Sequence, residues 1–298
     1  MGQTLFSQYE AARRCFEEAD EALGESLSSL IFDGPAAKLN LTENTQPAVL
    51  TVAHAAFRVL SERGFTPDVL AGHSLGEYAA LTACGALEFA DAVRLTRRRG
   101  RYMQAAVAPG IGAMAAVMRL DDDVVEAACQ EIEGVCQPAV YNAPGIVVIS
   151  GHVDPVHEVS NKLKSLGGRV TPLSVSAPFH CTLLGDAAEK LRLDLRETHF
   201  SCPTIPYVSN VDAAWQHDTT AEAIRMSLVE QVTKPVRWRH SISLMLERGI
   251  QRFWHVGPGR ANITHVKRQS KAVICGSTDT QVDLDKMLSD LGLQGTSV

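Results

Sequence analysis

Residues 72–76 read Gly-His-Ser-Leu-Gly and match the pattern Gly-x-Ser-x-Gly, which carries a nucleophilic serine in many α/β enzymes. An apolar run precedes the motif and a helical pattern from Leu75 to Cys84 follows it, so the serine stands at the strand–turn–helix junction that this chemistry requires. We expect Ser74 to lie on a strained turn, with a glycine on either side where strand and helix pack closest. The backbone N–H of Leu75 can then donate to an oxyanion. The alternative is a serine that only caps a helix.

A serine hydroxyl becomes nucleophilic when a base removes its proton, and the chain offers ten histidines for that role. His180 lies in the segment Ser-Ala-Pro-Phe-His, where the chain leaves a predicted small domain and enters a predicted large domain, both described below. His255 follows a predicted strand and is the competing candidate. Periodicity does not choose between the two.

Arg99 is the third residue with a chemical signal, because it falls on the apolar face of a helix predicted from Phe89 to Ala106. The opposite face, which we predict to be exposed to solvent, carries four more arginines: Arg94, Arg97, Arg98 and Arg101. A buried guanidinium requires an acceptor, and its planar fork suits a carboxylate. That carboxylate belongs either to an internal Asp or Glu or to a ligand, and the serine upstream favours the ligand.

The elements that must position these residues alternate between strand and helix, which predicts an α/β fold with a mostly parallel sheet. Residues 113–175 follow the order β-α-β-β-α-β of a ferredoxin-like unit. Segments with hinge character flank this unit, namely Pro-Gly-Ile-Gly at 109–112 and Ala-Pro at 177–178. We therefore predict an inserted small domain at residues 110–177 within a large domain formed by residues 1–109 and 178–298, with a cleft between them.

The composition of the 298-residue chain, 45% hydrophobic and 21% charged, is typical of a globular protein with a sizeable core. Its formal net charge of −6 argues against general nucleic-acid binding, and no apolar window is long enough to cross a membrane. The first thirty residues carry Glu10, Glu17, Glu18 and Asp20, where a signal peptide would need an apolar stretch. Seven scattered cysteines without a Cys-x-x-Cys pair predict reduced thiols and no metal site. We expect a cytoplasmic protein.

Five segments, in this order, resemble the malonyl-CoA:acyl carrier protein transacylases of fatty acid and polyketide synthesis. They are Gly-His-Ser-Leu-Gly-Glu-Tyr at 72–78, Arg-Gly-Arg-Tyr-Met-Gln at 99–104, Tyr-Asn-Ala-Pro-Gly at 141–145, Pro-Phe-His at 178–180 and Val-Gly-Pro-Gly-Arg at 256–260. The resemblance runs from the first residue to about Arg268. It implies a hydrolase-like large domain with an inserted ferredoxin-like small domain.

The resemblance implies a ping-pong acyl transfer that needs no cofactor. Ser74 would attack the thioester of malonyl-CoA with His180 as general base, and the phosphopantetheine thiol of acyl carrier protein would then take the malonyl group. Arg99 would hold the malonyl carboxylate. The backbone carbonyl of Gln231 would orient the histidine, and Phe179 would leave little room for an α-methyl group. The resemblance also assigns four further residues to substrate binding: His73, Gln46, Asn142 and Asn210.

The family pattern begins with an apolar strand and the motif Phe-Pro-Gly-Gln-Gly-Ser-Gln, whose first glutamine gives a backbone N–H to the oxyanion hole. The present sequence aligns from Met1 with residues that follow this motif, about 17 residues into the family pattern. Loss of one oxyanion donor costs ~3 kcal/mol in a protease. Without that segment we expect a less stable and slower enzyme than its relatives. Equal transfer rates before and after restoring the segment would contradict this expectation.

Two other functions stay open from the sequence. A serine esterase or thioesterase would use Ser74, Asp212 and His255, although it would leave Arg99 without a role. A degenerate homologue would bind carrier protein without transferring anything.

Carrier proteins are acidic, so we expect a basic docking patch on a monomer that binds neither nucleic acid nor membrane. The candidates are two groups, each equally well explained as a solvated helix face: Lys267, Arg268 and Lys271, and Lys162 and Lys164.

Overall fold

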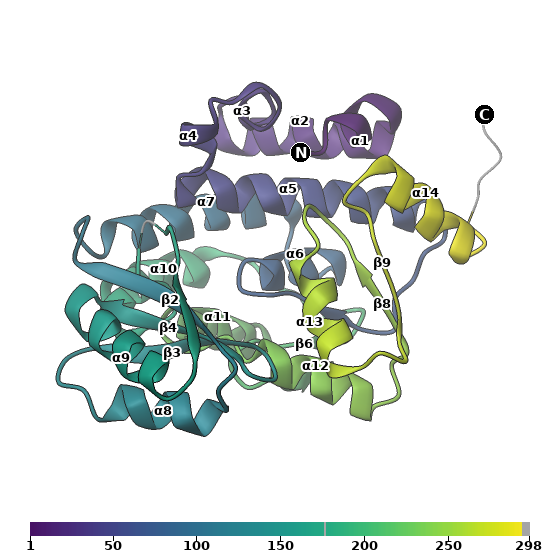
Figure 1. Cartoon of the computed structure of the whole chain (residues 1–298). Coiled ribbons are helices and arrows are strands. Elements are labelled where there is room, and N and C mark those ends of the chain that lie inside the picture. The colour runs from purple at the N-terminus through teal and green to yellow at the C-terminus, as the bar shows by residue number, and fades with distance from the viewer. Residues whose placement is uncertain (176, 294–298) are drawn as a thin grey trace.

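The computed structural model describes residues 1–175 and 177–293. Its N-terminal part is a layer of helices stacked on two long helices, α5 and α7 (Figure 1). The elements of this part are α1 (Gln3–Gln8), α2 (Glu10–Leu23), α3 (Leu27–Asp33), α4 (Ala36–Leu39), α5 (Thr42–Ser61) and α7 (Phe89–Ala105).

The helical layer covers the outer face of α7. Arg97, which the sequence pattern placed in solvent, is only 6% exposed and pairs with Glu25 of the connection between α2 and α3. It also donates to Asn44 Oδ1 of α5. The prediction for Arg97 was wrong, because the pattern of one helix does not show which other helices cover it.

The predicted ferredoxin-like unit is confirmed. Its elements are β2 (Gly112–Met118), α8 (Asp122–Gln130), β3 (Cys136–Ala143), β4 (Ile146–His152), α9 (Val153–Ser165) and β5 (Arg169–Pro172). The strands form one antiparallel sheet in the order β3-β4-β2-β5. Because side chains alternate between the faces of a strand, Ile149 packs with Val125 and Leu163 of the unit's own helices. Its neighbour Val148 instead joins a second core with Trp238.

Two of the contacts between the small unit and the rest of the molecule lie at its linking segments and at its edge strand β3. The two chain crossings lie against each other, since a Cβ added to Gly112 would sit 2.4 Å from Pro178 Cγ. The edge strand β3 also pairs with Val236, which accepts from Tyr141 N at 2.9 Å and donates to Ala139 O at 2.9 Å. The domain boundaries at 109/110 and 177/178 stay a prediction.

The large domain is α/β, as expected, with parallel pairs β1–β6 and β8–β9. In the described residues these pairs belong to separate sheets, and β7 runs antiparallel to β6. The strands are β1 (Leu70–Ala71), β6 (Tyr207–Val208), β7 (Trp215–Gln216), β8 (Arg252–His255) and β9 (Ile274–Ser277). The remaining helices are α6 (Gly76–Ala83), η1 (Thr182–Leu184), α10 (Gly185–Glu197), α11 (Ala221–Thr233), α12 (Trp238–Glu247), α13 (Ala261–Gln269) and α14 (Gln281–Asp290).

Residues 1–175 and 177–293 contain neither a membrane-spanning helix nor a cluster of metal-ligating side chains. No helix in this part is long and apolar enough to cross a bilayer. No three His, Cys, Asp or Glu side chains in it are grouped so that they could hold a metal ion. All seven cysteines are free thiols, as predicted, and the sulfur atoms of Cys129 and Cys136 are 3.9 Å apart.

Candidate active site

Ser74 lies on the sharp turn between β1 and α6 that its motif predicts. Its φ of +52° is in the left-handed region that non-glycine residues rarely adopt, so the backbone here is strained. Two hydrogen bonds from one side chain hold this turn: Ser74 N donates to Asn210 Oδ1 at 2.7 Å, and Asn210 Nδ2 donates to Gly72 O at 2.6 Å. The turn therefore presents the hydroxyl in a fixed position.

The two glycines of the motif have different roles. A Cβ on Gly72 would lie 1.8 Å from Gly76 O, so only glycine fits where strand and helix meet. A Cβ on Gly76 would meet no atom within 4 Å. The expectation that both glycines relieve crowding is thus confirmed for Gly72 and wrong for Gly76.

Gly72→Ala should lower the free energy of unfolding by at least about 3 kcal/mol, because backbone atoms of α6 must move to admit the methyl group. Gly76→Ala is the matched control, and it should change stability by less than about 1 kcal/mol since the space is open and alanine favours helix. Urea unfolding of both variants measures the difference. Equal effects of the two substitutions would contradict this description of the turn.

His180 meets Ser74 from the segment that enters the large domain after the inserted unit. Ser74 Oγ and His180 Nε2 are 2.7 Å apart, and His180 Nδ1 lies 2.7 Å from the backbone oxygen of Gln231. The second contact favours the tautomer with its proton on Nδ1, which leaves Nε2 free to accept the serine proton. His180 is 4% exposed and has a φ of +58°, so this residue is also held in a strained conformation.

The electrostatic surroundings keep His180 neutral. Burial and the nearby Arg99 guanidinium lower the pKa of His180 from 6.5 to about 3, although the hydrogen bond to Gln231 opposes the shift. A neutral imidazole is the form that can act as a base.

Stability should fall as the pH drops from 7 to 5. Five histidines have lowered folded-state pKa values, so below about pH 6.5 the unfolded chain binds protons that the folded chain does not bind. They are His54 and His180, with a pKa of about 3, His240 and His265, with a pKa of about 4, and His73, whose pKa is lowered by burial. Raised carboxyl pKa values, above all that of Glu77 at about 7, act in the opposite direction but are outnumbered. Urea unfolding at several pH values measures the trend, and stability that rose from pH 7 to 5 would contradict it.

Arg99 is 2% exposed and points at the nucleophile, with Nη2 3.1 Å from Ser74 Oγ. Its other acceptors are neutral amide oxygens: Gln46 Oε1 at 2.6 Å from Nη1 and Gln231 Oε1 at 2.8 Å from Nη2. Within the described residues the guanidinium forms no ion pair, and its Nε has no hydrogen-bond partner. The internal carboxylate that the sequence left open is therefore not in contact with Arg99 in this part of the chain.

The remaining predicted residues surround these three. His73 Nε2 lies 2.9 Å from Asn142 Oδ1 of β3, so the inserted unit touches the turn itself. Phe179 is half-buried between the two large cores. The N–H of Leu75 makes no hydrogen bond to another described residue, as an oxyanion donor requires. Gln46 contacts Arg99, and Asn210 contacts backbone of the turn.

Among the described residues, the competing residues make no contact with the Ser74 hydroxyl. His255 Nε2 is 3.2 Å from the backbone oxygen of Pro258, and Asp212 is exposed. Among the described residues, the side-chain partners of the Ser74 hydroxyl are His180 and Arg99. The structure thus brings His180, and not His255, to the Ser74 hydroxyl.

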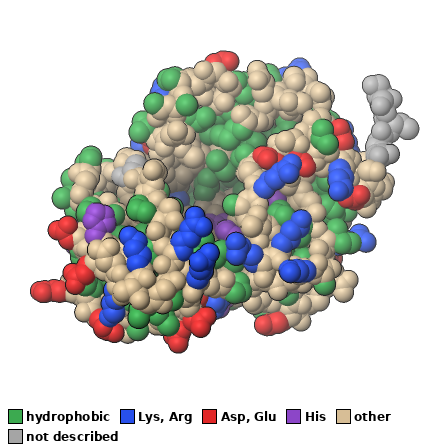
Figure 2. All heavy atoms as spheres, in the orientation of Figure 1, with side chains coloured by type: hydrophobic (Ala, Val, Ile, Leu, Met, Phe, Trp, Pro, Cys, Tyr) green, Lys and Arg blue, Asp and Glu red, His purple; other side chains and the backbone are tan. Residues whose placement is uncertain are grey.

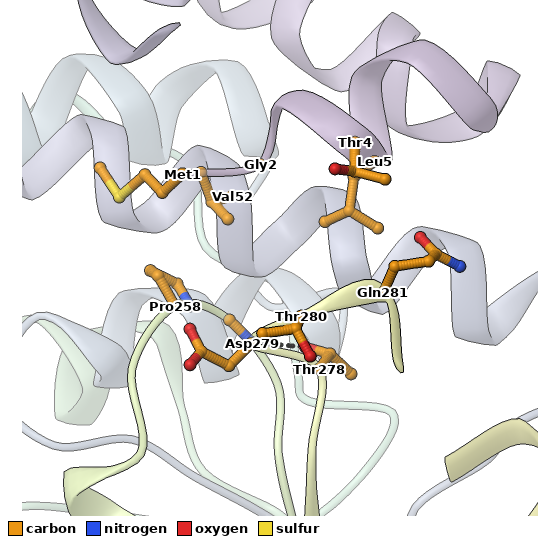
Figure 3. A pocket seen from close by; sticks show the side chains of 11 residues that line it. Met1, Gly2, Thr4, Leu5, Val52, Pro258, Thr278, Asp279, Thr280 and Gln281 are labelled. Atoms are coloured by element: carbon orange, nitrogen blue, oxygen red, sulfur yellow. Dashed lines mark hydrogen bonds between the residues drawn. The ribbon is translucent and has the colours of Figure 1, made fainter. Parts of the chain in front are cut away.

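Sequence reasoning missed Glu77 and the side chain of Gln231, both fully buried beside the site. A signal for Glu77 was present, since it is the only charged residue in the apolar helix Gly76–Ala83. Figure 2 shows the surface hollowed between the inserted unit and the large domain, with histidine atoms in its depth. A separate cavity of the large domain, drawn in Figure 3, is lined by Gly2, Pro258 and Asp279 among others and shares no residue with the predicted site.

Comparison with known proteins agrees with this geometry. Residues 1–271 match the family model described as acyl transferase domain. The chain is 44% identical over 268 residues to the malonyl CoA-acyl carrier protein transacylase of Escherichia coli K12, covering 89% of this chain and 86% of that protein. It is 42% identical to the transacylase of the same name from Bacillus subtilis 168 over 287 residues, covering 94% and 90%.

Solved structures give the same result. The malonyl CoA-acyl carrier protein transacylase of Coxiella burnetii superposes with a TM-score of 0.93 at 37% identity, over 96% of this chain and 92% of that one. A malonyl-transacylase solved in complex with its type II polyketide acyl carrier protein gives 0.94 at 37% identity, over 97% and 94%. This chain belongs to the acyl transferase family and, within it, to the malonyl CoA-acyl carrier protein transacylases.

Proposed function

We propose that this protein transfers a malonyl group from malonyl-CoA to the phosphopantetheine thiol of an acyl carrier protein through an ester on Ser74. The observation that carries the proposal is the convergence of a neutral base and a cation on one hydroxyl: His180 Nε2 at 2.7 Å and Arg99 Nη2 at 3.1 Å. In a malonyl ester the free carboxylate lies two C–C bonds beyond the ester carbon. A cation beside the hydroxyl is therefore within reach of that carboxylate.

In the first half-reaction His180 Nε2 takes the proton of Ser74 while Oγ attacks the thioester carbon. The N–H of Leu75 donates to the oxyanion. The carbon–sulfur bond then breaks, and the coenzyme A thiolate takes the proton from His180. In the second half-reaction the phosphopantetheine thiol gives its proton to His180 and attacks the ester, and the proton returns to Ser74 Oγ when the ester bond breaks.

The specificity for malonyl rests on two side chains in this proposal. Arg99 selects donors with a carboxylate, and the half-buried ring of Phe179 leaves little space for an α-methyl group. Discrimination over one methyl group is limited to ~1–3 kcal/mol. The residues named in the two half-reactions all belong to this chain, so the proposed chemistry needs no residue from a second copy.

The experiment supplies the enzyme with malonyl-CoA and holo carrier protein and measures coenzyme A release, free malonate and malonyl carrier protein. We expect malonyl carrier protein to form in step with coenzyme A. Free malonate in its place would instead show a thioesterase, and no coenzyme A release would show a binding protein. His255→Ala should transfer at the rate of the unmodified enzyme, because His255 contacts Pro258 and not Ser74.

For docking of the acidic carrier protein we propose the basic group on and after α13, made of Lys267, Arg268 and Lys271. All three are exposed and have no ion pair within the described residues, whereas Lys162 of the other candidate group pairs with Glu131. Figure 2 shows Lys and Arg side chains gathered below the hollow, over this side of the large domain and over the inserted unit.

Replacing Lys267 and Arg268 together by glutamate should lower kcat/KM for carrier protein about tenfold at low salt and leave acylation by malonyl-CoA unchanged. Lys164→Glu on α9 is the control and should have little effect. The measurement is the transfer rate as a function of carrier concentration and ionic strength. A larger loss for the α9 variant would assign docking to the inserted unit.

A further inference from the structure

Beneath the nucleophile lies a buried polar layer that the proposed reaction does not use. It consists of the side chains of Glu77, Asn210 and Gln231, each with no exposed surface. A carboxyl group, a carboxamide from a loop and a carboxamide from α11 thus meet inside the protein. Burying such groups is costly unless their hydrogen bonds are satisfied, so their arrangement calls for a specific explanation.

Glu77 is three residues after the nucleophile, in the first turn of α6. Its Oε2 accepts from Gln231 Nε2 at 2.6 Å and from Asn210 N at 3.3 Å, while Oε1 has no partner among the described residues. Burial raises the pKa of Glu77 to about 7, opposed by the hydrogen bonds from Gln231 and Asn210 and by the charge of Arg99. The side chain forms no ion pair with Arg99 and is out of contact with the Ser74 hydroxyl.

The amide of Gln231 connects Glu77 to the reacting groups. Its Nε2 donates to Glu77 Oε2 and, at 3.0 Å, to the backbone oxygen of Ser74, and its Oε1 accepts from Arg99 Nη2 at 2.8 Å. Because Glu77 Oε2 is an acceptor, the NH₂ group of the Gln231 amide must face it. The oxygen of the same amide then faces Arg99. If the Gln231 amide were reversed, its NH₂ group would lie against the donor Nη2 of Arg99.

We propose that Glu77 is a positioning residue for recognition of the substrate carboxylate, because it fixes the amide of Gln231 that in turn holds Arg99 beside Ser74. The arrangement restrains Arg99 with a neutral oxygen and not with a carboxylate. Its charge therefore stays available to the substrate. This inference rests on the proposed malonyl transfer. It adds Glu77 to the residues that recognise the substrate, with an effect transmitted through Gln231 and Arg99.

Two substitutions of Glu77 distinguish an effect on the position of Arg99 from a general loss of structure. In Glu77→Gln the new amide oxygen can accept both hydrogen bonds in place of Oε2. In Glu77→Leu that acceptor is lost while the volume is nearly kept. The readout is the rate of Ser74 acylation by malonyl-CoA and by acetyl-CoA, a donor without a carboxylate, followed by mass spectrometry of the acylated protein.

We expect Glu77→Leu to raise KM for malonyl-CoA about tenfold or more and to change acylation by acetyl-CoA less than about threefold. Glu77→Gln should restore the malonyl KM to within about threefold of the unmodified enzyme. In an Arg99→Ala background, Glu77→Leu should cause no further loss of preference for malonyl, since both residues act on one contact. Equal losses for the two donors, or additive losses in the double variant, would overturn the proposal.

Two further measurements keep the test decisive. If thermal unfolding shows that Glu77→Leu does not fold, Gln231→Glu replaces it: a carboxylate facing Arg99 should abolish the preference for malonyl, and a retained preference would overturn the proposal. Acylation of the unmodified enzyme is measured first. No malonyl ester there would refute the proposed function itself, a result distinct from a failure of the Glu77 variants.

Discussion

A His180→Ala variant should form the malonyl ester about 10²- to 10⁴-fold more slowly than the unmodified enzyme, because it lacks the base that takes the Ser74 proton. His180 is the only imidazole that contacts this hydroxyl among the described residues, at 2.7 Å. No other group shown near Ser74 is suited to replace it, since the Arg99 guanidinium stays protonated. Stopped-flow measurement of coenzyme A release in the first turnover gives the rate.

The control for this variant is His255→Ala, which tests the hydrolase-type alternative directly. That alternative requires His255 to be the base, whereas the structure places it against Pro258 O. A slow His255→Ala enzyme combined with a normal His180→Ala enzyme would exclude the catalytic arrangement described above. Circular dichroism of both variants ensures that folded proteins are compared.

Arg99→Ala should lower kcat/KM for malonyl-CoA by about 10²- to 10³-fold, since truncation of one partner of a buried charge pair costs ~2–5 kcal/mol. Acylation by acetyl-CoA should change much less, so the variant loses its preference for the charged donor. Arg99→Lys should recover little of the activity, because a lysine ammonium lacks the planar fork. Initial rates with both donors measure the effect.

Arg98→Ala is the matched control on the same helix. Arg98 is exposed and pairs with Asp194, so its loss should leave both donors unaffected. If Arg99→Ala lowered kcat/KM equally for malonyl-CoA and acetyl-CoA, the guanidinium would have a structural role. The proposal that it binds the malonyl carboxylate would then fail.

The sequence was sufficient for the residues whose chemistry is encoded locally. The turn at Ser74 follows from a short motif between an apolar run and a helix, and it was confirmed together with its positive φ. The helix of Arg99 was placed within one residue of its observed end, so its apolar face could be identified. The β-α-β-β-α-β order was likewise readable, because each element has its own period and the breaks contain glycine or proline.

What the sequence could not supply depends on contacts between distant segments. Periodicity could not choose between His180 and His255, and it was the family resemblance that favoured His180. The contact itself depends on packing of residue 180 against α11, where Gln231 O meets Nδ1. Arg97 was misplaced because another layer covers its helix. Asn210 stays a predicted substrate-binding residue, and no local pattern showed that both ends of its amide contact backbone of the turn. These hydrogen bonds join residues that are 51 to 138 positions apart and leave no periodic pattern in the chain.

The most direct test of the proposed function is peptide mass spectrometry of the enzyme after brief mixing with malonyl-CoA. We predict a malonyl group on the peptide that contains Ser74, and its disappearance when holo carrier protein is added. Ser74→Ala should gain no mass under the same conditions. A malonyl group on another residue, or transfer to the carrier without any acylated enzyme, would contradict a reaction through the Ser74 ester.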